Sequence, residues 1–338
     1  MKVLIADQTL VTRLMPLDVA IGVMKDAFLM LAGGDVAMPP RSLLDLPGRD
    51  GLLGLMPAFL GGIEAVGVKV VAAFEVNAGT KYDGHQGIVL FFDTQRGMLR
   101  AIVDATAITA IRTAAVSGLV TDLLAREDAG DVAIIGAGTQ AHTHLQAMCA
   151  VRPVRRVRVF SKSMESATAF AERAARIVGL PIEVAETAEA AVTGADLICT
   201  ATTATEPVVL GDWVSPGAHV NAIGAYTPST RELDSALVAK SRLYADKRDF
   251  LLHEGGEFVI PKNEGLIGDD HIVGELGELL TGQAPGRSSP QQITVFKSLG
   301  VAIEDLAAAH FVYEAAKERG EGTWIDIGGL HFGRAAGE

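Results

Sequence analysis

Three basic residues in the N-terminal part of the chain stand in settings that are unusual for a solvated cation. Arg41 begins an extended segment after two prolines, Lys69 lies within the apolar run 66–71, and Arg112 lies in the Ala- and Ile-rich segment 108–115. A cation among apolar neighbours is costly unless an anion accompanies it, and a substrate carboxylate is such an anion, which Arg binds bidentately. The alternative is that each cation reaches solvent or pairs with a local carboxylate, and for any one cation alone this is the better interpretation.

His85, in the polar loop 83–87, is a further candidate for chemistry. A histidine there could donate a proton or a hydrogen bond to a substrate, and a loop histidine without a catalytic role fits the pattern equally well. No spacing indicates a Ser-His-Asp triad or a pair of catalytic carboxylates. The two cysteines, Cys149 and Cys199, lie in apolar surroundings without metal-ligand spacing, so no metal site is predicted.

The clearest binding motif is the glycine turn 136–141, which follows an apolar strand-like run and precedes a helical segment. Gly136 would make the tight turn, Gly138 would let the backbone approach a pyrophosphate, and Ala141 would allow the helix to pack closely on the strand. The helix N-terminus that follows would then offer N–H groups to the phosphates, and Thr139 and Gln140 of the turn are expected to contact the cofactor. A purely structural turn is the alternative, and the flanking strand and helix favour the dinucleotide site.

The end of the next strand-like run bears on which dinucleotide binds. A site selective for NAD usually carries Asp or Glu there, to bind the ribose hydroxyl groups. This chain has Ser161, Lys162 and Ser163 after Phe160, and no carboxylate. A lysine with two hydroxyl groups could hold a 2′-phosphate, so we predict that NADP(H) is preferred and that NAD(H) is possible. A solvated loop lysine is the alternative.

Two kinds of segment must position these residues. Before residue 126 the pattern is typical of a small α+β domain with an antiparallel or mixed sheet, whereas from residue 131 strands alternate with helices, which implies parallel pairing. We therefore predict an α/β protein with a Rossmann domain over residues 126–309 and a smaller domain formed by residues 1–125 and 310–338. The expected helices cover 16–33, 106–126, 142–150, 164–178 and a closing segment 301–319. The expected strands cover 52–56, 65–73, 87–92, 99–103, 132–135, 154–160, 182–185, 197–201, 220–225, 242–245 and, as the last strand, 292–296.

Composition narrows the class of protein. Of the 338 residues 49% are hydrophobic and the net charge is −12, which is typical of a globular protein and argues against a nucleic-acid partner. The basic run from Arg152 to Arg158 alternates Arg with Val and is interpreted as a solvated strand edge. The N-terminal apolar segment is too short for a signal peptide, because a charged residue follows after few residues. No uninterrupted apolar run approaches the roughly 18 residues of a membrane span. A cytoplasmic enzyme without a membrane partner is expected.

At these motifs the chain resembles the ornithine cyclodeaminase/mu-crystallin family over nearly its whole length. The resemblance implies a homodimer, a Rossmann domain, and a substrate-binding and dimerisation domain completed by the C-terminal segment. It also implies that Arg41, Lys69 and Arg112 together hold the α-carboxylate of a small amino or imino acid. The other matching segments are 67–69, 85–91, 108–115, 136–141, 221–225, 274–278, 296–300 and 304–307. Beyond the residues already named, cofactor contacts are expected from Arg112, Thr113, Thr200, Ala201, Thr202, Ile223, Gly224, Ser298 and Gly300.

The chain departs from the ornithine cyclodeaminases of this family at Tyr226, where those enzymes carry an Asp thought to bind or activate the side-chain amine. A phenol, with an ordinary pKa of about 10, is neutral at pH 7 and cannot replace the negative charge of that carboxylate. The segment is more similar to the family's ketimine reductases, in which Tyr226 and Thr227 would line the substrate pocket. This similarity implies NAD(P)H-dependent reduction of Δ1-pyrroline-2-carboxylate to L-proline and of Δ1-piperideine-2-carboxylate to L-pipecolate.

In such a reduction the imine nitrogen must be protonated, and Lys69, His85 or an ordered water could supply the proton. Lys69 and His85 are therefore the candidate catalytic residues. Three alternatives remain at this point: an ornithine cyclodeaminase, a linear amino-acid dehydrogenase similar to alanine dehydrogenase, and a non-catalytic NADPH- or small-molecule-binding protein of mu-crystallin type.

Overall fold

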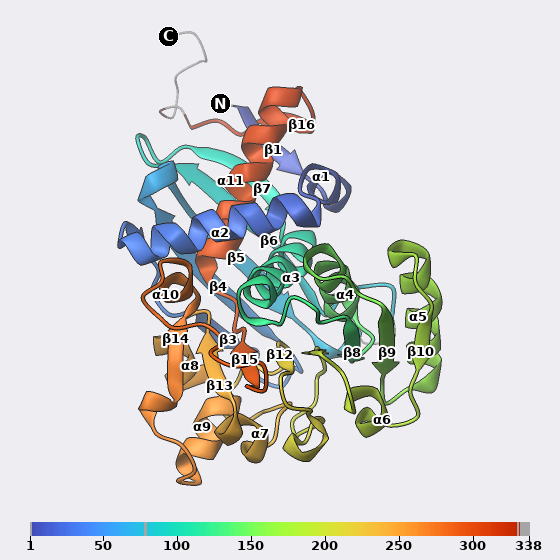
Figure 1. The fold of residues 1–338 in the computed structure, drawn as a ribbon. Coiled ribbons are helices and arrows are strands. Elements are labelled where there is room, and N and C mark those ends of the chain that lie inside the picture. Colours follow the sequence, from blue (N-terminus) through green and yellow to red (C-terminus); the bar gives the residue numbers. More distant parts are fainter. Residues whose placement is uncertain (1, 78–79, 330, 332–338) are drawn as a thin grey trace. The chain divides into compact units, whose positions relative to one another are not determined.

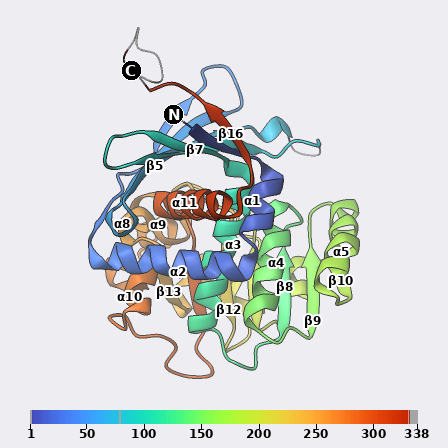
Figure 2. The same cartoon turned by 90° about the horizontal axis from the view of Figure 1, so that it is seen from above.

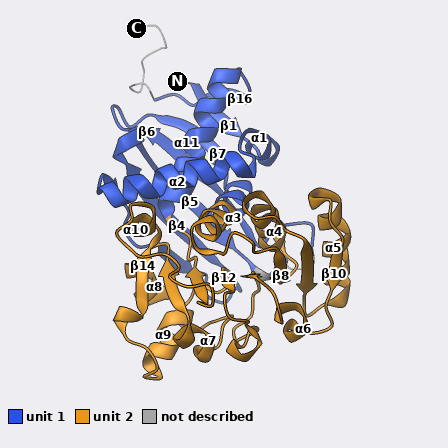
Figure 3. Cartoon of the chain, viewed as in Figure 1, with its two compact units in different colours: residues 1–112, 302–338 blue, residues 113–301 orange. Residues whose placement is uncertain are grey.

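A computed structural model describes residues 2–77, 80–329 and 331, and the chain divides into two compact units (Figure 1, Figure 3). Unit 1 contains residues 1–112 and 302–338, and unit 2 contains residues 113–301. The first boundary falls inside α3 (Ala105–Leu124) and the second at the start of α11 (Ala302–Arg319). Sequence patterns alone predict these boundaries at 125/126 and 309/310, because periodicity does not reveal with which unit each turn of a helix packs.

Unit 1 is built on a mixed sheet, as its strand pattern predicts. The described strands lie in the order β16-β1-β7-β6-β5-β4-β2, and β3 also pairs with β4. Strands β1 and β7 are parallel, and the other neighbours are antiparallel. The strands are β1 (Lys2–Ala6), β2 (Val36–Ala37), β3 (Ser42–Asp45), β4 (Leu52–Leu60), β5 (Ala65–Ala73), β6 (His85–Asp93), β7 (Leu99–Asp104) and β16 (Thr323–Asp326).

Helix α11 covers one face of this sheet. It contacts β4, β5, β6 and β7 and packs against α2 (Leu17–Gly33), and Figure 2 shows the two helices running alongside each other. Position 67, beneath this helix, requires a glycine, because a Cβ atom there would lie 2.4 Å from the Leu90 carbonyl oxygen of β6 and 2.8 Å from Leu306 Cδ1 of α11. A short helix, α1 (Gln8–Leu14), follows β1 and is capped by the Asp7 side chain, which accepts a hydrogen bond from the Leu10 N–H.

The opposite face of the unit 1 sheet keeps apolar side chains at the surface. Leu55, Val70 and Ile88 are paired side by side across β4, β5 and β6, so their side chains share one face. Leu55 is 40% and Ile88 38% exposed, and Val66 on β5 is 36% exposed. An apolar surface of this kind on a sheet is typical of a face that another protein surface covers.

Strands β1, β2, β3, β14 (Ile272–Glu275) and β16 were not among the predicted strands. The expectation that 292–296 forms the last strand is wrong, because β16 follows it in the chain. The last strand is β16, which pairs with β1 at the sheet edge. Its four residues alternate poorly in burial, and a short edge strand therefore lacks the apolar pattern that identifies buried strands. The 292–296 segment itself contains β15, which begins at Thr294.

Unit 2 is an α/β unit with a parallel sheet, as predicted. Its described strands lie in the order β10-β9-β8-β11-β12-β15-β13-β14, and every neighbouring pair is parallel. The strands not yet bounded are β8 (Asp131–Ile135), β9 (Arg156–Phe160), β10 (Ile182–Val184), β11 (Leu197–Thr200), β12 (His219–Ala222), β13 (Arg242–Ala245) and β15 (Thr294–Lys297). The helices are α4 (Thr139–Val151), α5 (Met164–Val178), α6 (Ala188–Val192), α7 (Ser235–Lys240), α8 (Arg248–Glu254), α9 (Gly256–Asn263) and α10 (Leu276–Leu280).

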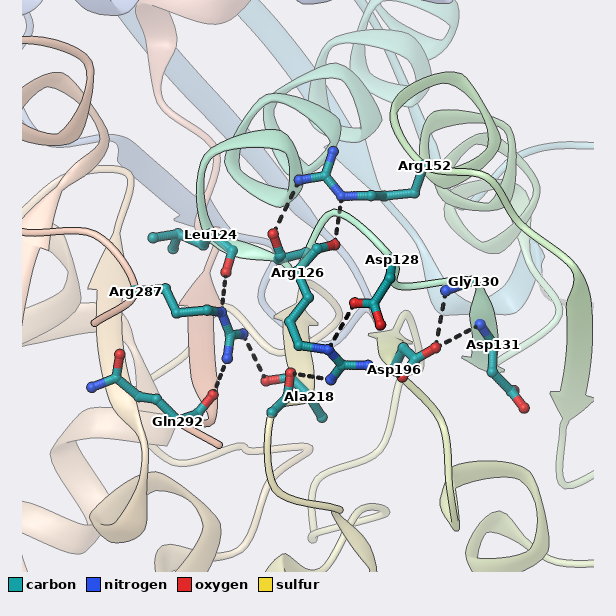
Figure 4. Close-up of polar contacts among 12 residues, drawn as sticks. Leu124, Arg126, Asp128, Gly130, Asp131, Arg152, Asp196, Ala218, Arg287 and Gln292 are labelled. Carbon is teal, nitrogen blue, oxygen red and sulfur yellow. Dashed lines mark hydrogen bonds and ion pairs between the residues drawn. The ribbon is translucent and has the colours of Figure 1, made fainter. Parts of the chain in front are cut away.

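Arginine side chains form hydrogen bonds and ion pairs at the amino-end edge of the unit 2 sheet (Figure 4). Arg152 donates hydrogen bonds to the carbonyl groups of Thr121, Asp122, Ala125 and Arg126, and thereby caps the end of α3. Arg126 pairs with Asp196 at 2.6 Å, while the Asp196 carboxylate accepts the N–H groups of Gly130 and Asp131 at the start of β8. Arg126 also donates a hydrogen bond to the Gly217 carbonyl group at 3.0 Å, so these contacts join the segments that enter β8, β11 and β12.

The same contacts correct the interpretation of the basic run 152–158 as a solvated strand edge. The Arg152 and Arg158 side chains are buried, and Arg158 donates to the carbonyl groups of Ala190 and Thr193 and pairs with Asp131. Only Arg155 and Arg156 keep large exposed side chains within this run. Alternation of Arg with Val does not distinguish a solvated arginine from one that is satisfied by backbone carbonyl groups.

Helix α3 is, within the described residues, the one helix long and apolar enough by length and composition to cross a membrane. The sequence pattern had no uninterrupted apolar run of that length, because Arg112, Ser117 and several threonines interrupt this helix. Within its most apolar 18-residue window, 83% of the residues are buried inside the fold, which is typical of a core helix.

Candidate functional site

Lys69 and Arg112 are both buried in unit 1, with 3% and 4% of their surfaces exposed. Lys69 lies in β5, where the register pairs it with Met56 on one side and Val89 on the other, both buried residues on the face under α11. Arg112 projects from α3, whose first turn is capped by the Asp104 carboxylate. The sheet and α3 therefore hold two cations inside the same unit, where each needs an anion.

The anions are Glu304 and Asp305, in the first turn of α11. Lys69 Nζ lies 3.2 Å from Asp305 Oδ1, Arg112 Nε lies 3.1 Å from the same oxygen, and an Arg112 terminal nitrogen lies 2.5 Å from Glu304 Oε2. A helix N-terminus also favours negative charge. In the structure these two cations therefore pair with carboxylates of the chain itself, which lie far from them in the sequence.

Glu304 and Asp305 are functional candidates that sequence reasoning missed. Their only signal was membership of the family-like segment 304–307, because 236 residues separate Asp305 from Lys69. Both carboxylates are essentially fully buried, and Asp305 Oδ2 has no hydrogen-bond partner among the described residues. A buried acceptor oxygen without a partner is unusual, and it is typical of a position that a ligand or water completes. We call these four residues the unit 1 ion cluster: Lys69, Arg112, Glu304 and Asp305.

Burial changes the acid–base behaviour of this cluster. It lowers the pKa of Lys69 from 10.5 to about 8; the Arg112 charge also lowers it, while the Asp305 and Glu304 carboxylates raise it. The ammonium group is therefore protonated at neutral pH and gives up its proton far more readily than a surface lysine. A lysine of this kind is suited to donating a proton in a reaction near pH 7.

Arg41 and His85 are carried to the same face of the sheet as Lys69. Arg41 precedes β3, and continuing the Ser42–Leu55 register by one step places it opposite Met56, the neighbour of Lys69. His85 begins β6 and pairs with Ala73, which lies four residues from Lys69 along β5 and therefore on its face. Partial removal from water lowers the pKa of His85, the charges of Lys69 and Arg112 lower it further, and Asp83 opposes them.

In unit 2, the glycine turn has the geometry that the motif predicts. Gly136 has φ +114°, and a Cβ atom there would lie 2.4 Å from the Ala201 carbonyl oxygen, so only glycine fits. Gly138 is the N-cap of α4, and a Cβ atom there would meet no atom within 4 Å. Neither the φ angle nor packing requires glycine at 138, and the space above the helix N-terminus is open. An incoming pyrophosphate fits this arrangement, with Ala141 fully buried behind it.

The three residues after β9 also keep the arrangement expected for a phosphate ligand. Lys162 is exposed, and Ser163 caps α5, its Oγ accepting a hydrogen bond from the Ser166 N–H at 3.1 Å. The Ser163 hydroxyl hydrogen is still a donor, and the N-terminus of a 15-residue helix adds positive potential there. No carboxylate stands at positions 161–163.

Most of the other predicted cofactor residues lie at the carboxyl-end edge of the unit 2 sheet. Thr200, Ala201 and Thr202 end β11, Ile223 and Gly224 follow β12, and Ser298 and Gly300 follow β15. The strand order reverses between β8 and β11, which is where a doubly wound sheet binds a dinucleotide. Strand β12 ends at Ala222, earlier than the predicted 225, because the chain turns at Gly224.

The remaining predicted residues divide between the units. Thr113 is buried in α3 at the start of unit 2, and the half-exposed Tyr226 and Thr227 follow Gly224, with Thr227 hydrogen-bonded to Thr230 at 2.8 Å. The site predicted from sequence therefore forms two groups, the cations and His85 in unit 1 and the cofactor residues in unit 2. Among the described residues, no set of three or more His, Cys, Asp or Glu side chains is arranged to hold a metal ion.

The sequence and the fold are both similar to those of known proteins. The model of the ornithine cyclodeaminase/mu-crystallin family matches residues 1–320. The ketimine reductase mu-crystallin of Mus musculus is 40% identical over 282 residues, which cover 83% of this chain and 86% of that protein. The Thermococcus litoralis Δ1-pyrroline-2-carboxylate reductase, solved with NADH and L-proline, is 38% identical, with a TM-score of 0.92 over 95% of this chain and 99% of that chain. An archaeal alanine dehydrogenase dimer with bound NAD is 32% identical, with a TM-score of 0.90 over 97% and 100% of the two chains.

Proposed function

Because the chain belongs to the ornithine cyclodeaminase/mu-crystallin family, we propose that it reduces small cyclic 2-imino acids with NAD(P)H. It is an oxidoreductase of C=N bonds that uses a nicotinamide dinucleotide, as its relatives are. The proposed substrates are Δ1-pyrroline-2-carboxylate, which gives L-proline, and Δ1-piperideine-2-carboxylate, which gives L-pipecolate. The observation that carries the proposal is the buried unit 1 ion cluster.

The donors of the cluster and of Arg41 support a substrate that carries a carboxylate. Lys69 and Arg112 are held by Asp305 and Glu304 in the cluster. Arg41 lies on the same face, and a guanidinium group can bind a carboxylate bidentately. Lys69 makes one hydrogen bond, to Asp305, among the described residues, so its ammonium group keeps donors for a ligand. Arg41, Lys69 and Arg112 therefore form the proposed carboxylate clamp.

The proton that the reaction consumes is assigned to Lys69. The bound dinucleotide supplies the hydride that adds to the C=N carbon, while the nitrogen gains a proton. Lys69, with its pKa lowered to about 8, is protonated at pH 7 and acidic enough to give that proton to the imine nitrogen. The partnerless oxygen of Asp305 lies beside it and can accept a hydrogen bond from the protonated nitrogen or from a water. His85, whose pKa is lowered, contributes a neutral imidazole at the same face.

Tyr226 supports reduction over cyclodeamination. A cyclodeaminase must hold and activate a second, side-chain amine, and a neutral phenol offers no charge for that task. The test is NADPH consumption against a panel of cyclic and linear 2-imino acids, with product analysis. We expect turnover of the five- and six-membered rings. Ammonia and proline from ornithine would indicate a cyclodeaminase, turnover of pyruvate with ammonia an alanine dehydrogenase, and NADPH binding without turnover a binding protein.

For the cofactor, we propose a preference for NADP(H) over NAD(H). The support is Lys162 between two serines, at an exposed helix N-terminus without a carboxylate. The Thermococcus relative was solved with NADH, so the shared class is a nicotinamide dinucleotide and the preference depends on these residues. Steady-state kinetics with both cofactors test it, and a higher kcat/KM with NADH would contradict it.

We also propose that the protein is a cytoplasmic homodimer that pairs through the exposed apolar face of the unit 1 sheet. The side chains of Leu55, Val66 and Ile88 support this, since exposed aliphatic side chains on one sheet face are unfavourable in water. The archaeal alanine dehydrogenase is itself a dimer. Light scattering on the purified chain tests the oligomeric state.

A further inference from the structure

Glu232 is a fully buried carboxylate at the carboxyl-end edge of the unit 2 sheet. Its Oε2 atom accepts hydrogen bonds from Thr200 Oγ1 and from the Gly224 N–H, both at 2.7 Å. Its Oε1 atom accepts from the Thr202 N–H at 2.7 Å and from Thr202 Oγ1 at 2.8 Å. One side chain therefore joins the end of β11 to the loop after β12.

A carboxylate has enough oxygen lone pairs to accept all four of these donors. Two are backbone N–H groups, which cannot reverse their direction, so each needs an oxygen lone pair. Space around them is tight: a Cβ atom at Gly224 would lie 2.1 Å from the Thr202 carbonyl oxygen and 2.7 Å from Glu232 Oε1. The two loops are therefore in direct contact, and Glu232 fixes their separation.

Two further buried charged residues, Glu257 and Lys297, are linked to Glu232. Glu257 Oε1 accepts the backbone N–H of Glu232 at 2.9 Å, and Lys297 Nζ lies 3.2 Å from Glu257 Oε2. Lys297 also donates a hydrogen bond to the Ala225 carbonyl group, which continues the connection to the loop after β12. Burial raises the pKa of Glu232 and the Glu257 charge adds to this, whereas Lys297 and the donors from Thr200 and Thr202 oppose it.

We propose that Glu232 is a positioning residue for the dinucleotide, holding the ends of β11 and β12 in the one arrangement that accepts the cofactor. This inference rests on the proposed function only through cofactor binding, because Thr200, Thr202 and Gly224 are the residues expected to contact the dinucleotide. Glu232 itself is buried beneath them and acts through their backbone. A correctly folded unit 2 with these loops released would bind the dinucleotide weakly.

The test compares Glu232→Gln with a matched control, Asp196→Asn, in the full-length chain. Asp196 also accepts two backbone N–H groups, those of Gly130 and Asp131, but at the amino-end edge of the same sheet (Figure 4). Thermal unfolding reports stability, and fluorescence titration with NADPH reports affinity without needing turnover. In Glu232→Gln an amide NH2 faces a buried donor, and we expect the Kd for NADPH to rise about tenfold to a hundredfold. In Asp196→Asn we expect a lower Tm and a Kd within about twofold of the wild type.

A milder variant keeps the test valid if Glu232→Gln does not fold. The Thr200 side chain is fully buried, so Thr200→Val removes its hydrogen bond to Glu232 and leaves the Thr200 backbone available to the dinucleotide; the Kd should rise about threefold to tenfold. In an active enzyme the KM for NADPH should rise in both variants while the KM for the imino acid stays constant. An unchanged Kd in Glu232→Gln, or equal losses of affinity in Glu232→Gln and Asp196→Asn, would overturn the proposal. If the wild-type chain binds NADPH but reduces no imino acid, only the proposed reaction fails; if it binds no dinucleotide, both fail.

Discussion

Replacing Asp305 with Asn tests the proposed proton donor through its pKa. The substitution keeps the shape of the side chain and removes the charge 3.2 Å from Lys69 Nζ. At that distance and an effective dielectric constant of about 20, two unit charges interact by about 5 kcal/mol, which is an upper limit because Asn can still hydrogen-bond. Opposite charges this close usually shift a pKa by about 1 to 3 units. The pKa of Lys69, about 8 in the wild type, should therefore fall to roughly 5 to 7.

The assay is the pH dependence of kcat/KM for the imino acid, which reports the ionisation of the free enzyme. If protonated Lys69 is the donor, wild-type kcat/KM should decrease above about pH 8. In Asp305→Asn the decrease should begin one to three units lower, so that little activity remains at pH 8 and much of it returns near pH 5 to 6. An alkaline limb at the same pH in both proteins would refute the assignment of Lys69.

Glu304→Gln is the matched control. It removes the other carboxylate of the cluster, which pairs with Arg112 and has the weakest influence on the pKa of Lys69. We expect the alkaline limb of this variant to move much less than that of Asp305→Asn. Both variants break a buried ion pair, which costs about 3 to 5 kcal/mol of folding free energy. Comparable losses of stability with different pH profiles would separate the effect on Lys69 from general damage.

The same pKa predicts a stability change with a defined sign. The folded pKa of Lys69 lies below its ordinary value of 10.5, so between about pH 8 and 10.5 the unfolded chain binds more protons than the folded one. The Lys69 contribution to stability therefore becomes more favourable as the pH rises through this window, and the buried charge costs stability below it. Unfolding of a Lys69→Met variant should lack this dependence.

Three further outcomes are expected. Lys69→Ala or Arg112→Ala should lower kcat/KM for imino acids by about two orders of magnitude or more while far-ultraviolet circular dichroism stays native-like, and near-normal turnover in both would contradict the carboxylate clamp. Lys162→Ala should raise the KM for NADPH about tenfold and leave the KM for NADH unchanged, whereas equal effects on both would argue against a 2′-phosphate contact. Ile88→Asp should give a monomer by light scattering, with a surface substitution such as Glu165→Gln as the control that keeps the dimer; a dimer in both would move the interface elsewhere.

Local signals in the sequence were sufficient for most of the fold. The β5 and β13 bounds and the α5 bounds match the predicted segments, because each is a continuous apolar or amphipathic run ended by turn residues. The glycine turn was predictable for the same reason, since the strand, the turn and the helix are adjacent in sequence. Short edge strands such as β16 were missed, because their order depends on the neighbour to which they pair rather than on their own pattern.

The candidate site was predictable only in part, and the missing part was the set of counter-ions. Lys69 and Arg112 stand out because a cation in an apolar run has a visible cost. Glu304 and Asp305 do not, because two acidic residues in the first turn of a helix are also what an exposed helix start favours. Glu232 is hidden in the same way, since a single acidic residue near a turn gives no sign that four donors converge on it.

These hidden carboxylates explain why the C-terminal segment belongs to unit 1. Helix α11 packs against β5, with Leu306 next to Gly67, and this packing brings Asp305 to Lys69 and Glu304 to Arg112. Without α11, the same sheet and α3 would hold two buried cations with no compensating charge, which is strongly unfavourable. The packing that completes unit 1 and the electrostatics that set the pKa of Lys69 therefore arise from the same few contacts.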